Sequence, residues 1–102
     1  MQVPIDVSLL TPTSAVGRVS GPIELTALPR VGDLVSLERA ANPSAGFSGQ
    51  LAVTDVLHVA SDKGHEPMLA LSDVVSPTEE AAAFIGKALE RHYGLFFETY
   101  AR

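Results

Sequence analysis

Three histidines are the residues of this 102-residue chain that are best suited to proton transfer or to metal binding. His58, His65 and His92 stand far apart, and none has a second histidine at the spacing that is typical of a metal site. His65 belongs to a polar turn and is expected to be solvated. The sequence therefore predicts no metal site, and it leaves His58 and His92 as candidate ligand-binding residues.

His92 stands near the end of a segment with helical periodicity, on the apolar stripe that contains Leu89. A histidine in the last turn of a helix meets the negative end of the helix dipole and can bond a terminal carbonyl. The alternative is a role in binding a ligand or in sensing pH. We favour the structural role, and the ligand-binding role is a hypothesis to be tested.

Phe47 is the one large side chain in a loop of small residues, proline and glycine that spans residues 40–48. Aromatic side chains are usually buried, so we expect Phe47 to tuck under the loop and cover the core. In the alternative interpretation, Phe47 lines a ligand pocket together with His58 and residues of the helix.

No longer motif in the chain carries a recognisable chemistry. Residues 46–49 resemble the start of a nucleophile elbow, but Gln50 stands where that motif requires glycine. Phosphate-cradling glycine patterns are missing, and the lack of cysteine removes thiolate metal sites and cysteine nucleophiles. The sequence thus predicts no cofactor and favours a protein that is not an enzyme.

Apolar and polar residues alternate with a period of two over much of the chain, which predicts β-strands. The alternating segments are residues 3–9, 16–20, 23–27, 34–37, 50–59 and 68–71. Gly21 and Pro22 are expected to end the second of them. The last two are expected to form a hairpin, with a β-bulge near Asp55 where the alternation changes phase.

The C-terminal third of the chain is predicted to be helical over residues 76–93. Ser76 is the expected N-cap, with Pro77 at the first helical position and Glu79 at the third. Gly94 is expected to end the helix in the left-handed conformation.

The order of these elements, strands first and a helix last, favours an α+β fold over alternating parallel units. We expect one domain, residues 1–102. Its first part, residues 1–75, is predicted to be a small antiparallel β-barrel or a strongly curved sheet of about five or six strands. The helix at residues 76–93 and an aromatic tail at residues 94–102 complete it.

Aromatic residues are concentrated at the C-terminus, where five of the six lie between residues 84 and 100. Phe96, Phe97 and Tyr100 follow the predicted helix. In one interpretation the helix and tail cover an open end of the barrel and complete its core. In the other, these three aromatic residues form an outward patch suited to a symmetric dimer or to another protein partner.

The composition bounds the partners and the location of the protein. The chain has 12 acidic and 7 basic residues and a net charge of −5, which disfavours binding to nucleic acid or to an anionic membrane surface. The N-terminus lacks the features of a signal peptide, and the longest apolar run, residues 81–85, is far too short to span a membrane. We therefore expect a cytoplasmic protein, and its composition is bacterial in type.

The function that these observations favour is a non-enzymatic protein-binding or self-assembly module of a bacterial-type cytoplasmic protein, forming a homodimer. The alternative is a small ligand-binding barrel or enzyme with a pocket near residues 40–48. An apolar pocket with converging polar groups would support the alternative. An exposed contact surface at Phe96, Phe97 and Tyr100 would support the assembly module.

Overall fold

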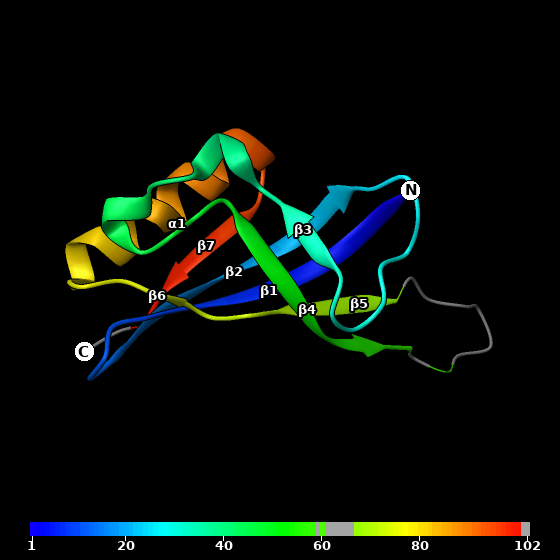
Figure 1. Ribbon diagram of the computed structural model, residues 1–102, viewed down its shortest axis with the longest axis horizontal. Helices are drawn as coiled ribbons and strands as arrows, with labels where there is room; N and C mark the ends of the chain where they lie inside the picture. Colours follow the sequence, from blue (N-terminus) through cyan, green and yellow to red (C-terminus); the bar gives the residue numbers. More distant parts are fainter. Residues whose placement is uncertain (59, 61–66, 101–102) are drawn as a thin grey trace.

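The protein combines one sheet of seven strands with one α-helix, as Figure 1 shows for a computed structural model that describes residues 1–58, 60 and 67–100. The elements are β1 (Gln2–Leu10), β2 (Ala15–Glu24), β3 (Leu34–Ser36), β4 (Gln50–Leu57), β5 (Met68–Leu71), β6 (Val74–Val75), α1 (Glu79–Tyr93) and β7 (Phe96–Thr99), with 3-10 turns η1 (Glu38–Ala40) and η2 (Pro43–Ala45). The predicted α+β class is therefore confirmed. The described part of residues 1–75 contains six strands, as expected, and β7 adds a seventh from the segment that we expected to be a tail.

The sheet is open and mixed. Its strand order is β3-β4-β5-β1-β2-β7, and β6 pairs with β1 beyond the end of β5. Both β5 and β6 run parallel to β1, so the expectation of an antiparallel sheet is wrong. The order ends at β3 on one side and at β7 on the other, so a closed barrel is not confirmed. A curved sheet is compatible with the structure, since β4 crosses the direction of β1 at a steep angle (Figure 1).

The longest pairing joins β1 and β2, and β2 does not end at Gly21 and Pro22 as predicted. The amide of Leu25 donates to the carbonyl of Met1, which shows that odd-numbered residues of β2 bond to β1. Pro22 is an even-numbered residue and lies opposite Pro4, so β1 does not accept a hydrogen bond from its backbone nitrogen. Because its missing N–H lies on the other side of β2, the proline is tolerated inside the strand.

The hairpin of β4 and β5 is confirmed, and so is its bulge. The two strands are antiparallel, and the register shifts between Val53 and Asp55. The shift lets Val53 and Val56 both point toward the interior although they are three positions apart, since their partners Leu71 and Leu69 are both buried.

The helix begins later than predicted. Thr78, not Ser76, is the N-cap, and its Oγ1 accepts a hydrogen bond from the Ala81 amide at 3.1 Å. Ser76 is still part of the extended chain because its amide donates to the Leu10 carbonyl of β1 at 2.8 Å. The predicted end is confirmed: Gly94 has a φ of 67° and its amide donates to the Glu90 carbonyl.

The core lies between the sheet and α1, which covers one face of it (Figure 1). Alternate residues of β1 are fully buried there, together with Ile85 and Leu89 of α1. Phe47 is also buried in this core, as the structural interpretation predicted. The other face of β1 carries half-buried residues such as Asp6 and Ser8, and among the described residues no helix covers it.

Candidate binding surfaces

The first candidate surface is the edge strand β7. The left-handed Gly94 reverses the chain after α1, and β7 then pairs antiparallel with β2 in the register Val19 with Phe97. Two glycines allow this close approach. A Cβ on Gly86 of α1 would lie 2.6 Å from the ring of Phe97, and a Cβ on Gly17 of β2 would collide with the Glu98 backbone carbonyl. β7 is therefore held closely by both neighbours.

The backbone of β7 presents one row of polar groups away from β2. The Tyr100 amide donates to the Val16 carbonyl at 2.9 Å, so the even-numbered residues of this strand bond inward. The N–H and C=O groups of Phe97 and Thr99 therefore point to the outer edge. One of these donors is already occupied, because the Phe97 amide donates to the carboxylate Oε2 of Glu90 in α1 at 3.2 Å.

The three aromatic residues that the sequence singled out are divided by the alternation of the strand. Phe97 is half-buried against Gly86, on the side of the sheet that α1 covers. Phe96 has 61% of its surface exposed and Tyr100 has 44%. The register places Phe96 on the opposite side from Phe97. Tyr100 lies beyond the end of β7 and lines a hollow together with the core residue Val16 and with Ala83 of α1. The tail thus both completes the core and leaves an aromatic surface open, and we call Phe96, Glu98, Tyr100 and the outer backbone of β7 the β7 edge.

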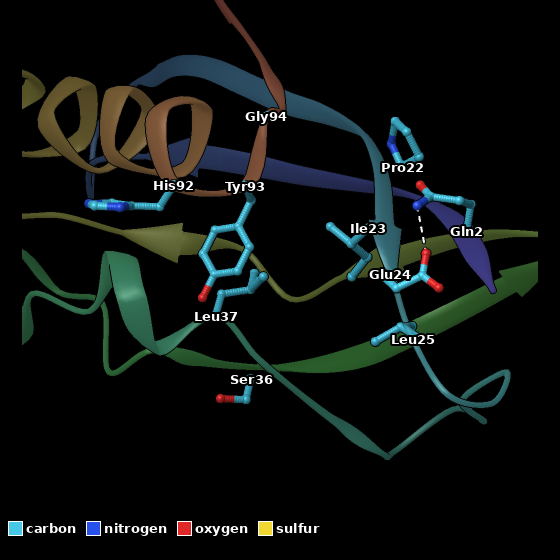
Figure 2. Close-up of a pocket in the computed structure, with 10 residues that line it drawn as sticks. All are labelled: Gln2, Pro22, Ile23, Glu24, Leu25, Ser36, Leu37, His92, Tyr93 and Gly94. Atoms are coloured by element: carbon cyan, nitrogen blue, oxygen red, sulfur yellow. Dashed lines mark hydrogen bonds between the residues drawn. The ribbon is translucent and has the colours of Figure 1, made fainter.

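The second candidate surface is a cavity of about 520 Å³ at the place where the sheet fails to close. Beyond the pairing with β7, residues 22–25 border this cavity from one side, and Ser36 of β3 and Leu37 border it from the other. We call this boundary the seam. The lining comprises Gln2, Pro22, Ile23, Glu24, Leu25, Ser36, Leu37, His92, Tyr93 and Gly94 (Figure 2).

Polar groups of the seam cavity are mostly bonded to one another or to the backbone. The Tyr93 hydroxyl accepts a hydrogen bond from the Arg39 amide at 3.1 Å. The Glu24 carboxylate accepts one from the Gln2 side chain at 2.6 Å, drawn as a dashed line in Figure 2. The imidazole of His92 points away from this pair, at the margin of the cavity (Figure 2). The cavity therefore offers a polar rim without a convergent catalytic grouping among the residues drawn.

The structure does not bring the three predicted ligand-binding residues together at the seam. His92 lines the cavity, Phe47 is buried in the core, and His58 is exposed beyond the end of β4. His92 is not part of the buried stripe as expected, because Tyr93 packs against the core in the last turn of α1. His65 lies outside the described residues. A ligand-binding role for Phe47, His58 or His92 remains a prediction.

Sequence reasoning did not find the residues that shape the seam. Glu24 and Gln2 are brought together by the pairing of β1 with β2, and Ser36 of β3 lines the same cavity. No local pattern marks such residues, since their proximity depends on where the curved sheet stops. Across residues 1–58, 60 and 67–100, no three acidic or histidine side chains are grouped closely enough to hold a metal ion. In the same ranges, α1 is too short and polar to cross a membrane.

Comparison with protein-family models, with curated proteins and with solved structures finds no match for this chain.

Proposed function

We propose that this protein is a non-enzymatic self-assembly module that associates through the β7 edge. The observation that carries the proposal is an edge strand with outward backbone groups at Phe97 and Thr99 and with exposed aromatic side chains at Phe96 and Tyr100. Unpaired strand edges are templates for the addition of another strand. Aromatic residues are enriched at the centres of protein interfaces because they bury a large area at low entropic cost.

The charge of the chain supports a protein as the partner. Its net charge of −5 disfavours nucleic acid, which attracts clustered basic residues. Near the β7 edge, Arg18 of β2 forms an ion pair with Asp6 at 3.2 Å, so its positive charge is largely balanced within the sheet. Exposed aromatic side chains beside a backbone edge, with the negatively charged Glu98 between them, suit a polypeptide strand better than a phosphate backbone.

The test is the solution mass measured by light scattering over a range of protein concentrations. We expect the wild type to associate, and we expect Phe96→Ser combined with Tyr100→Ser to weaken association by about tenfold or more, since each aromatic side chain contributes about 1 kcal/mol or more at an interface. Leu34→Ser is the matched control, because Leu34 is 63% exposed on the opposite edge strand β3.

Two results would overturn this proposal. In the first, the wild type stays monomeric at the highest concentration reached. In the second, Leu34→Ser weakens association as much as the aromatic double substitution does, so that the β7 edge has no special role.

Binding of a small polar molecule at the seam is a second candidate function. The specific observation in its favour is the volume of about 520 Å³, which lies in the range of known ligand pockets. Titration with a library of small polar compounds, followed by amide NMR shifts, tests it. Shifts that cluster at Ile23, Leu37 and Gly94 would support the candidate, whereas a library without binders or with binders elsewhere would contradict it.

A further inference from the structure

We propose that the seam receives an extended segment of a partner protein, which pairs with β3 on one side and with β2 on the other. The inference goes beyond self-association at the β7 edge and does not depend on it. Three observations carry it: the unpaired backbone groups on both walls of the seam, the space between the walls, and the side chains that line that space.

The β3 wall of the seam presents backbone groups that no strand uses. The Leu37 amide donates to the Gly49 carbonyl at 2.6 Å, and the Asp33 carbonyl accepts a hydrogen bond from β4 at 2.8 Å. Because hydrogen-bonding directions alternate along a strand, the odd-numbered residues of this segment bond to β4. The N–H and C=O groups of Leu34 and Ser36 therefore point away from β4. No strand among the described residues pairs with that side of β3.

The β2 wall presents backbone groups of the same kind. The odd-numbered residues of β2 bond to β1, so its even-numbered residues are directed to the other side. There β7 pairs with β2 only as far as Ser20, which lies opposite Phe96. Beyond this point the C=O group of Pro22 and both backbone groups of Glu24 meet no strand in the described part of the chain. Figure 2 shows Glu24 on β2 and Ser36 on separate walls of the cavity.

The gap between the two walls leaves space for one strand. Almost all Cα–Cα distances between β2 and β3 exceed 8 Å, whereas neighbouring paired strands lie about 4.8 Å apart. One strand residue occupies about 160 Å³, so the seam cavity of about 520 Å³ has room for about three residues. A second hollow of about 490 Å³ continues along β3 and shares Leu25 and Ser36 with the first. We call the two hollows together the seam groove.

The side chains of the seam groove indicate what the inserted segment carries. Leu25, Leu28 and Tyr93 pack against the core but are only partly buried, so apolar residues at alternate positions of an inserted strand would cover them. Two carboxylates, those of Glu24 and Asp33, line the groove, and no described lysine or arginine does. The N-terminal ammonium lies 3.1 Å from Glu24 and balances one of these charges. We therefore expect a segment that alternates apolar and polar residues and carries Lys or Arg.

These properties favour a foreign polypeptide over the other occupants of the groove. An extended chain has donors and acceptors on both of its sides and can use both walls at once, whereas a small polar compound reaches only a few of these groups. The net charge of −5 disfavours a second copy of this chain as the source of a basic segment.

The test begins with a phage-displayed library of short random peptides selected on the wild-type protein. The selected peptides are synthesised and titrated into the labelled protein, and amide NMR shifts are followed. We expect the shifts to cluster at Leu34, Ser36 and Glu24, and the peptides to alternate apolar residues and to contain Lys or Arg.

Ser36→Pro tests the β3 wall, because it removes one outward donor from an edge strand, where proline is tolerated. We expect this substitution to weaken peptide binding by about fivefold or more. Ser36→Ala is the matched control, since it keeps the backbone donor, and it should bind as the wild type does.

N-methylated peptides test whether both walls take part. Alternate N–H groups of an inserted strand face opposite walls, so methylation of either alternate set should weaken binding by about fivefold or more. A strand that is added to a single edge would tolerate methylation of the set that faces away from that edge.

Four results would overturn the inference: no selected peptide binds, the shifts cluster on β7, Ser36→Pro binds as tightly as Ser36→Ala, or only small polar compounds bind at the seam. If Ser36→Pro does not fold, the methylated peptides decide the matter, and full affinity after methylation of one set contradicts insertion between two walls. Self-association at the β7 edge is tested separately by the aromatic double substitution, so either proposal can fail alone.

Discussion

The two edges of the sheet are both tied to the last turn of α1, but in different ways. Beside β3, the Tyr93 hydroxyl accepts a hydrogen bond from the Arg39 amide at 3.1 Å, in the turn η1 that follows the strand. On β7, the Glu90 carboxylate accepts one from the Phe97 amide at 3.2 Å, within the strand itself. The Tyr93 contact holds the turn next to β3, whereas the Glu90 contact occupies a backbone donor of β7 itself.

This difference indicates how each edge avoids uncontrolled pairing. β3 has three residues and is followed at once by η1, so it offers a short template. β7 is longer and carries exposed aromatic side chains, and a charged side chain covers one of its outward donors. Short edge strands and charged side chains are both known protections against aggregation. Only protection by a charged side chain is reversible, because the side chain can move away from the backbone amide that it covers without unfolding the strand.

Gly17→Ala is expected to have the largest effect, because it forces β7 away from β2. The new Cβ would collide with the backbone carbonyl of Glu98, and backbone atoms cannot move aside as a flexible side chain can. Overpacking of this kind costs about 1–3 kcal/mol. We expect that loss in urea unfolding, together with faster hydrogen exchange of the Tyr100 amide, which bonds to Val16 across the two strands.

Ser20→Ala is the control for this substitution, because Ser20 pairs with Phe96 in the same two strands and its Cβ is already present. Its exchange rates should match those of the wild type. If Gly17→Ala left the Tyr100 amide as protected as before, the close approach of β7 would not depend on this glycine, and the account of the β7 edge would need revision.

Local signals predicted the parts of the fold that depend on near neighbours. The phase change at Asp55 marked the bulge, because a period-two pattern is interrupted wherever a residue is inserted. Gly94 marked the end of α1, because the left-handed conformation favours glycine. The predicted N-cap failed by two residues. Both Ser76 and Thr78 can cap a helix, and the hydrogen bond of Ser76 to Leu10 in β1 decides between them.

Pairing between distant segments could not be read from the sequence. β5 joins β1 in parallel, and nothing in either segment indicates this partner. β7 was predicted only as a tail, since adjacent phenylalanines break the alternation that marks a strand. The roles of Gly17 and Gly86 depend on β7 lying against them, so they became visible only with the fold. The same holds for the seam, whose residues meet because the sheet does not close.

Tyr93→Phe is expected to have a smaller effect, on the β3 side of the comparison. The substitution removes the acceptor of the Arg39 amide while keeping the ring that packs against the core. Because water can reach this exposed bond, the cost should be about 1 kcal/mol in urea unfolding. Self-association should not change, since the β7 edge is untouched. Tyr100→Phe serves as the control for unfolding, and an equal loss in both variants would show that the Tyr93 contact is not an anchor.

Glu90→Ala is expected to have the smallest effect and to distinguish the two edges most directly. The substitution frees the Phe97 amide, which a partner strand needs as a donor, so the proposed association should tighten by about two- to fivefold. Glu80→Ala on the same helix is the control and should leave the association constant unchanged. Sedimentation velocity over a concentration series measures both. Weaker association in Glu90→Ala would mean that the carboxylate holds β7 in the conformation that a partner binds. Glu90 would then stabilise the β7 edge instead of blocking one of its donors.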